Sequence, residues 1–227
     1  LSFNEYLISK YSDFHVVLNE RDAILLRKNY GKDADLIAPI AIEDKFRREP
    51  FRDKVKDDTR LALFVGTSFF PNIEGLRWYL NRVKPYTNDR LLIVGKGMDN
   101  YKSEFSSEDV EVLGFVDDLA ELYNRADYVI MPIFSGGGMK TKTAEAFMYA
   151  KTVLGTKEAF EGYENVNSNF AIECNDEKEF IDSVNIIMRQ KQNMNYNPFA
   201  RSYYLLNNSL DSVMHKWQSF FVNIGVI

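Results

Sequence analysis

Short runs of consecutive apolar residues alternate along the chain with segments whose apolar residues recur every three or four positions. The runs are three to five residues long, which is typical of strands buried on both faces of a sheet. The amphipathic segments between them are typical of helices that cover such a sheet. The predicted strands are Leu61–Val65, Arg90–Val94, Val110–Leu113, Tyr128–Pro132, Thr152–Leu154 and Phe170–Glu173. This alternation predicts an α/β fold with a doubly wound parallel sheet.

Helices are expected between these strands and after the last one. Asp118 with Glu121, and Asp176 with Glu179, have the spacing of a capping box, which marks the start of a helix. The last helix should turn three apolar side chains inward, namely Phe180, Val184 and Ile187. The predicted helices are about Ile73–Val83, Asp118–Arg125, Lys142–Ala150 and Asp176–Gln190.

The two ends of the chain differ from this alternating middle. Residues 1–39 predict a helix, a strand, a second helix and a second strand, at Phe3–Tyr11, Phe14–Leu18, Arg21–Tyr30 and Asp35–Ala38. Residues 43–60 are crowded with charges and contain Pro50, which indicates a linker or a solvated loop. The stretch from Asn193 is rich in Asn and Tyr, and a helix is predicted over Ser209–Val222.

Glycines follow four of the predicted strands. They are Gly66, Gly95 with Gly97, Gly114, and Gly136–Gly138. One glycine at a strand end is ordinary turn chemistry. In a parallel sheet, however, the carboxyl ends of the strands meet at one edge, where ligands bind. Four such glycine segments therefore favour a shared cleft.

The segment Met131–Gly155 carries the clearest chemical signal. A strand runs into Gly136–Gly138, then Lys140 and Lys142, and then a helix that carries Glu145. Glycine lets backbone N–H groups approach an anion, and a helix N-terminus adds partial positive charge. The carboxylate of Glu145 suits a ribose diol. The order predicts a site for a phosphorylated, ribose-bearing ligand; the alternative is a flexible surface turn with solvated lysines.

Composition narrows the class of protein. The 227 residues are 45% hydrophobic and 14% aromatic, enough for a folded core, and the net charge of −5 argues against nucleic acid as a partner. The chain contains no uninterrupted apolar run of transmembrane length. The single cysteine, Cys174, has no partner for an internal disulfide, which fits a reducing, cytoplasmic compartment.

Other chemically suggestive residues are expected to be structural or to lie on the surface without a catalytic role. His15 and His215 have no suitably spaced partners, so neither a metal site nor a Ser-His-Asp triad is predicted. Cys174 is interpreted as a packed or semi-exposed thiol rather than a nucleophile, the Asp117–Asp118 pair as helix capping, and Trp78–Tyr79 as helix packing on the sheet.

Four segments together resemble the donor-nucleotide half of the GT-B retaining glycosyltransferases, in the large group-one family that uses nucleotide sugars. They read LALFVGTSFFPNIEGLRWYLNRVKP, LLIVGKG, VEVLGFVDDLAELYNRADYVIMPIFSGGGMKTKTAEAFMYAKTVLGT and KEAFEG. The resemblance covers about Leu61–Gln190 and implies a Rossmann-like C-terminal half of a GT-B enzyme. By the same resemblance, residues 1–42 are the remnant of the acceptor domain and hinge, 43–60 a linker, 61–190 the nucleotide-sugar domain, and 191–227 a helical extension.

The resemblance also implies roles for single residues. Gly66 and Thr67 stand where the family binds the diphosphate, and Gly97 in the neighbouring loop joins the donor-binding candidates. Gly114, Phe115 and Val116 stand where backbone groups hold the base. Gly136, Gly137 and Gly138 stand where the donor sugar and phosphates lie, and Glu145 matches the glutamate that grips the ribose. Lys140 and Lys142 are the candidate catalytic charges.

Three positions depart from the family pattern. Gly137 replaces the first of two paired glutamates, Thr67 replaces an arginine, and Glu74 stands where many members have a lysine before Gly75. We expect Lys140 and Lys142 to substitute for the missing cations.

The resemblance implies transfer of a sugar from a nucleoside-diphosphate donor to a saccharide or lipid-linked acceptor, in polysaccharide or glycoconjugate biosynthesis. It implies no cofactor besides the donor, and a full-length protein at the inner face of the membrane. About forty residues precede the hinge, so the chain is expected to be a C-terminal, donor-binding fragment that is inactive alone. Two alternatives stay open: a non-catalytic nucleotide-binding or scaffold module, and a sugar-nucleotide epimerase of similar architecture.

Overall fold

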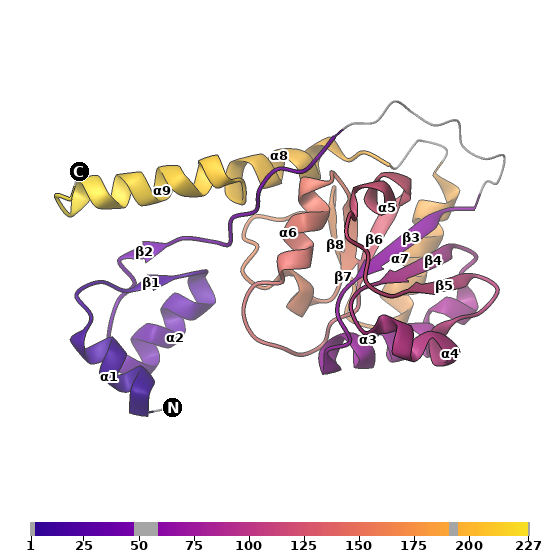
Figure 1. Cartoon of the computed structure of the whole chain (residues 1–227), viewed down its shortest axis with the longest axis horizontal. Coiled ribbons are helices and arrows are strands. Elements are labelled where there is room, and N and C mark those ends of the chain that lie inside the picture. The colour runs from indigo at the N-terminus through magenta and orange to yellow at the C-terminus, as the bar shows by residue number, and fades with distance from the viewer. Residues whose placement is uncertain (1–2, 48–58, 191–194, 227) are drawn as a thin grey trace.

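The structure is a computed structural model that describes residues 3–47, 59–190 and 195–226. Its body is a six-stranded sheet with helices on both faces (Figure 1). Every pair of neighbouring strands is parallel, which confirms the predicted fold class. In spatial order the strands are β5 (Val110–Leu113), β4 (Arg90–Val94), β3 (Leu61–Val65), β6 (Tyr128–Met131), β7 (Thr152–Gly155) and β8 (Ala171–Glu173).

The strand order reverses once, between β3 and β6. The chain builds β3, β4 and β5 outward on one side, then returns to place β6 against the other side of β3 and continues to β7 and β8. In an open parallel sheet the loops on the two sides of such a reversal diverge and leave a crevice. The loops that follow β3 and β6 flank this point.

The helices between the strands are α3 (Phe70–Arg82), α4 (Lys102–Phe105), α5 (Ala120–Arg125) and α6 (Thr141–Met148), and α7 (Glu177–Arg189) follows the last strand. Single 3₁₀ turns are η1 (Lys84–Tyr86), η2 (Met98–Tyr101) and η3 (Lys157–Phe160). Helices α3 and α7 pack together, because the rings of Trp78 and Tyr79 both contact the ring of Phe180 at 5.7 Å. The Trp78–Tyr79 pair is therefore a packing element, as predicted. Phe180, Val184 and Ile187 are buried, which also confirms the prediction.

The two predicted capping boxes differ in outcome. The Asp176 carboxylate accepts a hydrogen bond from the Glu179 N–H at 2.8 Å, so α7 begins as predicted. The prediction for Asp118 is wrong in detail, because its carboxylate accepts from the N–H of Ala120, two residues on, and α5 begins only at Ala120. Asp118 therefore closes a local turn before the helix rather than capping its third residue.

A small unit precedes the main sheet. Helices α1 (Phe3–Tyr11) and α2 (Glu20–Tyr30) pack with a separate two-stranded parallel sheet of β1 (Val16–Val17) and β2 (Leu36–Ile37). We call residues 3–38 the N-terminal unit. All four elements were predicted, with longer strands than those observed. The domain boundaries drawn from the sequence stay a prediction.

Two helices follow the main sheet. Helix α9 (Leu210–Asn223) was predicted, whereas α8 (Pro198–Asn207) was not. Asn197 starts α8 by accepting hydrogen bonds from two N–H groups of its first turn, and Pro198 occupies the first helical position. Helix α9 runs beyond the sheet and lies over the N-terminal unit, where the ring of Phe14 meets that of Phe220 at 5.5 Å (Figure 1).

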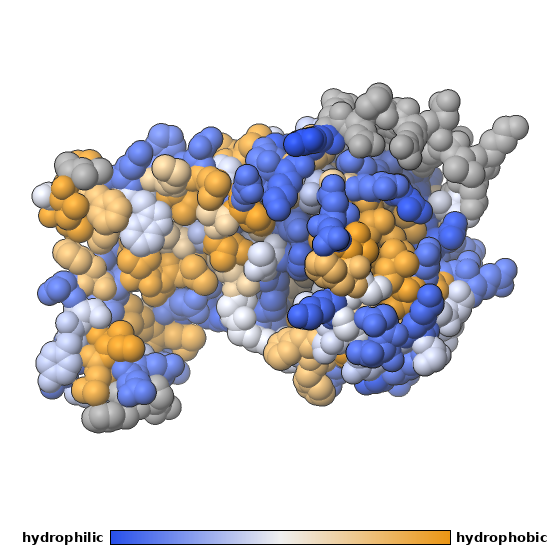
Figure 2. Space-filling model, in the orientation of Figure 1, coloured by the Kyte–Doolittle hydropathy of each residue, from blue (hydrophilic) through white to orange (hydrophobic). Residues whose placement is uncertain are grey.

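The N-terminal unit and α9 present many apolar side chains on the face shown in Figure 2. The exposed apolar residues on these elements include Tyr6, Ile8, Ile24, Leu25, Met214 and Val222. The candidate site lies elsewhere, at the carboxyl edge of the main sheet.

Part of the predicted linker is packed rather than solvated. Residues 48–58 lie outside the described residues, but Arg60 is buried and its guanidinium is 3.0 Å from the Asp127 carboxylate. Because Arg60 directly precedes β3 and Asp127 directly precedes the neighbouring β6, the two charges meet at the amino edge of the sheet. The prediction of a solvated segment over 43–60 is therefore wrong for Arg60.

A buried lysine lies at the same edge. Lys151 precedes β7, and its ammonium donates hydrogen bonds to the carbonyls of Ala126 at 2.9 Å and Asn195 at 2.5 Å. Loss of hydration on burial lowers the pKa of Lys151 to about 7. The contact with Asn195 ties the segment before α8 to the sheet.

We expect the free energy of unfolding to rise between pH 7 and 9, and the Lys151→Met variant to lose this rise. Above pH 7 the folded chain releases the Lys151 proton, whereas an unfolded lysine keeps it up to a pKa near 10.5, so the unfolded state binds more protons. The ceiling is about 1.4 kcal/mol per pH unit, and we expect about 1–2 kcal/mol over the range. Urea unfolding at pH 7, 8 and 9 measures it.

The exposed Lys178, changed to Met, is the matched control and should keep the wild-type pH dependence. If the free energy of unfolding changes equally with pH in wild type and Lys151→Met, the two carbonyls keep Lys151 charged between pH 7 and 9.

Candidate functional site

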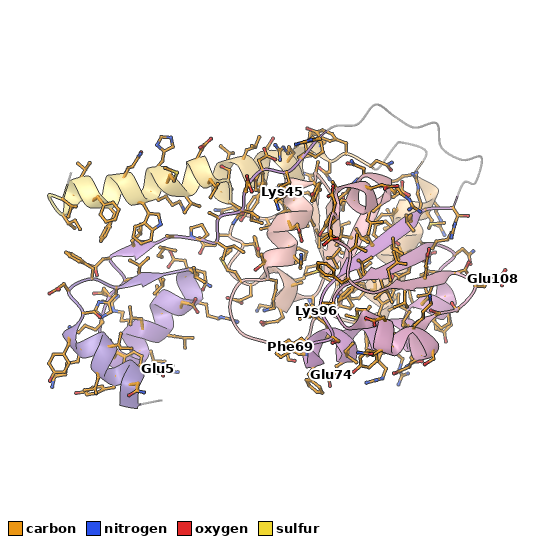
Figure 3. The ribbon with its side chains drawn as sticks, in the orientation of Figure 1. Glu5, Lys45, Phe69, Glu74, Lys96 and Glu108 are labelled. Carbon is orange, nitrogen blue, oxygen red and sulfur yellow. The ribbon has the colours of Figure 1, made fainter. Side chains whose placement is uncertain are left out.

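The loops that follow three neighbouring strands are joined by backbone hydrogen bonds. The N–H of Gly66 donates to Val94 at 2.9 Å, the N–H of Gly95 donates to Gly114 at 3.2 Å, and the N–H of Ser68 donates to Lys96 at 3.0 Å. Figure 3 labels Phe69 and Lys96, which come from the first two of these loops and lie near each other at the carboxyl edge of the sheet. The structure thus brings together the predicted glycine segments after β3, β4 and β5.

Glycine is required where these loops approach each other. At Gly95, φ is +153° and a Cβ atom would lie 1.8 Å from the carbonyl oxygen of Gly66. At Gly97, φ is +81° and a Cβ would lie 2.3 Å from the Ser68 hydroxyl oxygen. A side chain at either position would force the two loops apart. The glycines therefore allow these loops to pack closely beside the β3–β6 reversal.

The loop after β6 carries the glycine triplet on the other side of that reversal. Gly136 and Gly138 adopt positive φ values of 138° and 68°, whereas Gly137 has open space where a side chain would project. Gly136 and Gly137 are exposed. The loop leads directly into α6, with Lys140 as the residue before its first turn.

Lys140 is held by a carboxylate that the sequence analysis did not single out. Its ammonium lies 2.6 Å from the Glu158 carboxylate and donates a second hydrogen bond to the Gly138 carbonyl at 2.9 Å. The Lys140 side chain is only 15% exposed. This contradicts the alternative of a solvated lysine on a surface turn, at least for Lys140.

Lys142 and Glu145 face each other one turn apart on α6. The Lys142 ammonium lies 2.5 Å from Glu145 Oε2, and the hydroxyl of Tyr123 donates to the same oxygen at 3.3 Å. Tyr123 lies on α5, is fully buried and stacks on Tyr149 with ring centroids 4.4 Å apart. Burial first, and then the Glu145 charge, raise the pKa of Tyr123 well above its usual value, so Tyr123 stays a donor.

Tyr123 is a residue that the sequence analysis missed. It connects two candidate regions, because α5 follows the Gly114–Val116 loop and α6 carries Glu145. In that loop Phe115 is 69% exposed, and Val116 packs partly against the core. In the loop after β3, Thr67 is exposed, and its carbonyl accepts a hydrogen bond from the Asn72 side-chain amide at 2.9 Å.

A surface cavity of about 410 Å³ lies apart from these candidates. It opens between α3 and the start of α7, and its walls are Trp78, Phe134, Asn175, Asp176, Glu177 and Lys178. Phe134 lies two residues before the glycine triplet, but none of the predicted donor residues lines the cavity. Asn175 Oδ1, Nδ2 and backbone N–H are all engaged within the protein. We therefore place the candidate site at the strand-end loops.

His15 and Cys174 have structural surroundings, whereas His215 is exposed. His15 Nε2 is 2.9 Å from the Ser9 carbonyl. Burial raises the pKa of the Cys174 thiol to about 11, which suits a packed thiol rather than a nucleophile. Within the described ranges, no three His, Cys, Asp or Glu side chains form a group that could hold a metal ion. In the same residues, no helix has the length and hydropathy of a membrane span.

Comparison with known proteins gives a family match and a shared fold. Residues 59–190 match the family model described as glycosyl transferases group 1. A curated protein of Klebsiella pneumoniae, described as an uncharacterized 44.6 kDa protein in the cps region, is 29% identical over 147 residues. The aligned part is 58% of this chain but only 38% of that protein.

Two solved structures illustrate the fold. Sucrose-phosphate synthase from Thermosynechococcus elongatus superposes with a TM-score of 0.76 at 15% identity, over 97% of this chain and 60% of that one. Anabaena HepE, solved with UDP and glucose, superposes with a TM-score of 0.71 at 15% identity, over 97% of this chain and 65% of that one. At these identities the likeness shows the fold alone.

Proposed function

Because the chain belongs to the group 1 glycosyl transferases, we propose that it forms the donor-binding part of an enzyme that transfers a sugar from a nucleoside diphosphate to an acceptor. The observation that carries the proposal is the junction of glycine-lined loops beside the β3–β6 reversal, with the Lys140–Glu145 segment following the neighbouring strand β6. This is the place where an open parallel sheet accommodates a phosphorylated ligand.

The chemistry proposed for the site is electrostatic. When the sugar leaves, negative charge develops on the nucleoside diphosphate, and fixed positive groups and N–H donors stabilise it. Lys140 and Lys142 supply charge, and the backbone of Gly136–Gly138 and of Gly66–Thr67 approaches the phosphates. No cofactor besides the donor is proposed. Retention of the anomeric configuration is part of the proposal, and NMR of the product anomer would test it.

We assign Glu145 to the ribose and the Gly114–Val116 loop to the base. Tyr123 supports this assignment, because it fixes the Glu145 carboxylate through Oε2 and joins the two regions through α5. The other oxygen of Glu145 then remains for a ribose hydroxyl.

A uridine nucleotide is the first donor to test, because HepE has been solved with UDP and TarM of S. aureus has been solved with UDP and α-GlcNAc-glycerol. The cps-region relative favours a surface polysaccharide or a related glycoconjugate as the product. The chain spans less than half of that relative. We therefore propose that a saccharide or lipid-linked acceptor is held by residues outside this chain, at the inner membrane face, and that the chain alone does not turn over.

A second function has support in two observations. Gly137 has no side chain where the family pattern has a glutamate, and both candidate lysines are already paired with carboxylates. These features favour a nucleotide-binding or scaffold module without catalysis. A sugar-transfer assay on a longer protein that contains this chain separates the two, since only the first function gives a product.

Calorimetric titration of the chain with UDP, GDP and ADP tests donor binding itself. We expect one of the three to bind, and the corresponding nucleoside to bind more weakly because it lacks the phosphates. If none of the three binds, the proposed function fails.

Replacing Glu145 by Gln should leave folding nearly unchanged and weaken the bound nucleotide by roughly 1–3 kcal/mol, or about 5- to 150-fold. The change also releases Lys142 from its ion pair with the Glu145 carboxylate. The released lysine should strengthen binding of the phosphates and so offset part of the loss. The 2′-deoxy nucleotide separates the two effects. It should lose less affinity than the ribonucleotide in the variant, because its ribose contact is already weakened.

The exposed Glu121 on α5, changed to Gln, is the matched control and should bind both nucleotides like wild type. Equal losses for the ribonucleotide and its 2′-deoxy analogue in Glu145→Gln would remove Glu145 from the ribose site.

A further inference from the structure

A group of four alternating charges connects the N-terminal unit to the glycine loop. Glu158 of η3 uses both carboxylate oxygens: Oε1 lies 2.6 Å from the Lys140 ammonium, and Oε2 lies 3.6 Å from the guanidinium of Arg21. Arg21 also lies 3.1 Å from Glu161. We call Arg21, Lys140, Glu158 and Glu161 the charge tetrad.

The tetrad comes from segments far apart in the sequence. Arg21 lies on α2 of the N-terminal unit, Lys140 at the start of α6, and the two glutamates in and just after η3. A close contact accompanies it, because Gly162, with φ of +83°, leaves no room for a Cβ between Met139 and Asn19. The N-terminal unit and the loop that carries the candidate phosphate lysine therefore both approach the segment after η3.

The four side chains are only partly exposed, with Lys140 at 15%, both glutamates at 20% and Arg21 at 33%. Water therefore screens them less than it screens free surface charges. Two positive and two negative charges balance within the group, and Glu158 cancels much of the Lys140 charge that a diphosphate would meet.

Lys140 and Arg21 compete for the carboxylate of Glu158. Attraction of the Glu158 carboxylate toward Arg21 leaves the Lys140 ammonium freer to turn to another anion. Removal of the Arg21 charge leaves Lys140 as the only cation of the tetrad beside Glu158. In addition, Lys140 donates to the Gly138 carbonyl, so its position is coupled to the conformation of the glycine loop.

From this arrangement we propose that Glu158 and Arg21 are positioning residues of the donor site, and that they set how much of the Lys140 charge is available to a nucleoside diphosphate. The inference rests on the proposed function, because it requires a diphosphate near Lys140. It adds that the N-terminal unit contributes to donor affinity through Arg21. The competing explanation is a structural brace that only fastens the N-terminal unit to η3.

The experiment compares Glu158→Gln with Glu161→Gln in the full chain. The probe is whichever of UDP, GDP or ADP binds wild type, with its nucleoside as the phosphate-free reference. Glu158→Gln should bind the diphosphate about two- to fivefold more tightly, a size typical of a partly screened ion pair. Its affinity should also fall more steeply with salt, because Lys140 gains effective charge. Affinity for the nucleoside should not change.

Glu161→Gln is the matched control, since it removes a carboxylate from Arg21 but not from Lys140. It should not tighten diphosphate binding the way Glu158→Gln does. Thermal unfolding of each variant shows whether it is folded, and Glu158→Ala provides a second test if the glutamine variant is unstable.

Arg21→Gln should weaken diphosphate binding about two- to fivefold, since Glu158 then pairs with Lys140 alone. Arg21→Lys keeps the charge and should restore affinity. In the Glu158→Gln background, Arg21→Gln should have no effect, because the shared carboxylate is gone.

A structural brace predicts lower thermal stability in these variants with no change specific to phosphates. If wild type binds a diphosphate but Glu158→Gln does not bind it more tightly, or if the Arg21 effect persists without Glu158, the inference is overturned and the proposed function stands. If wild type binds none of the three nucleotides, the proposed function fails and the inference fails with it.

Discussion

Replacing Gly75 by alanine should lower the free energy of unfolding by about 3 kcal/mol or more, the range of severe overpacking. Alanine normally stabilises a helix interior by about 1 kcal/mol over glycine, so the expected sign is the reverse of the helix-propensity rule. The reason is a close approach. A Cβ at Gly75 would lie 1.8 Å from the carbonyl oxygen of Pro132, a backbone atom directly after β6. Helix α3 would have to move off the sheet.

Urea unfolding of the purified variant measures this loss. Gly137→Ala is the control, because Gly137 has open space around its Cα and should change stability by no more than about 0.5 kcal/mol. A Gly75→Ala protein as stable as wild type would mean that α3 does not pack against the Pro132 carbonyl. Since Pro132 leads into the glycine loop, a folded variant should also bind nucleotide more weakly.

The double variant Lys140→Ala, Lys142→Ala should lose about 100-fold or more in affinity for the nucleoside diphosphate. Charge-assisted hydrogen bonds are worth roughly 1.5–3 kcal/mol each, and the lower figure for two lysines gives about 3 kcal/mol. We use the lower figure because Glu158 and Glu145 already neutralise part of each charge. Calorimetric titration at two salt concentrations measures the loss, and the salt dependence should become shallower.

Lys178→Ala, Lys216→Ala is the matched control, with the same change in net charge at two exposed lysines outside the strand-end loops. Wild-type affinity in the Lys140, Lys142 double variant would exclude both side chains from the phosphate site.

The sequence predicts the main sheet well because buried parallel strands leave a strong local signal. The run Leu61–Val65, for example, is apolar throughout and is observed as β3 with the predicted bounds. Helix α8 could not be found in the same way. Its first turn reads Pro-Phe-Ala in an Asn- and Tyr-rich stretch, and the signal at Asn197 and Pro198 is a cap without a clear apolar stripe behind it. The capping-box prediction at Asp118 was wrong because an Asp or Asn side chain can accept a backbone hydrogen bond in a turn as well as at the start of a helix.

Much of the candidate site was predictable as a set of positions, but its contacts were not. Glycines at strand ends are visible in the sequence. Gly95, however, must be a glycine because the carbonyl of Gly66 leaves no room for a side chain, and only the pairing of β3 with β4 brings that carbonyl close. The partner of Lys140 is likewise a matter of three-dimensional packing. Glu158 lies 18 residues away in a short 3₁₀ turn, and no local periodicity relates the two.

The buried charges that affect stability lie at the amino edge of the sheet, away from the residues proposed for activity. Arg60, Asp89, Asp127 and Lys151 each directly precede a strand and are buried, and Asp89 also accepts a hydrogen bond from the Tyr128 hydroxyl at 2.6 Å. The candidate site lies at the opposite ends of the same strands. Buried ionic groups are often replaced by well-packed apolar side chains with no loss, or even a gain, of stability. Engineering for thermal tolerance can therefore start at this edge, a full strand length from the residues that would meet the ligand, and avoid the usual exchange of activity for stability.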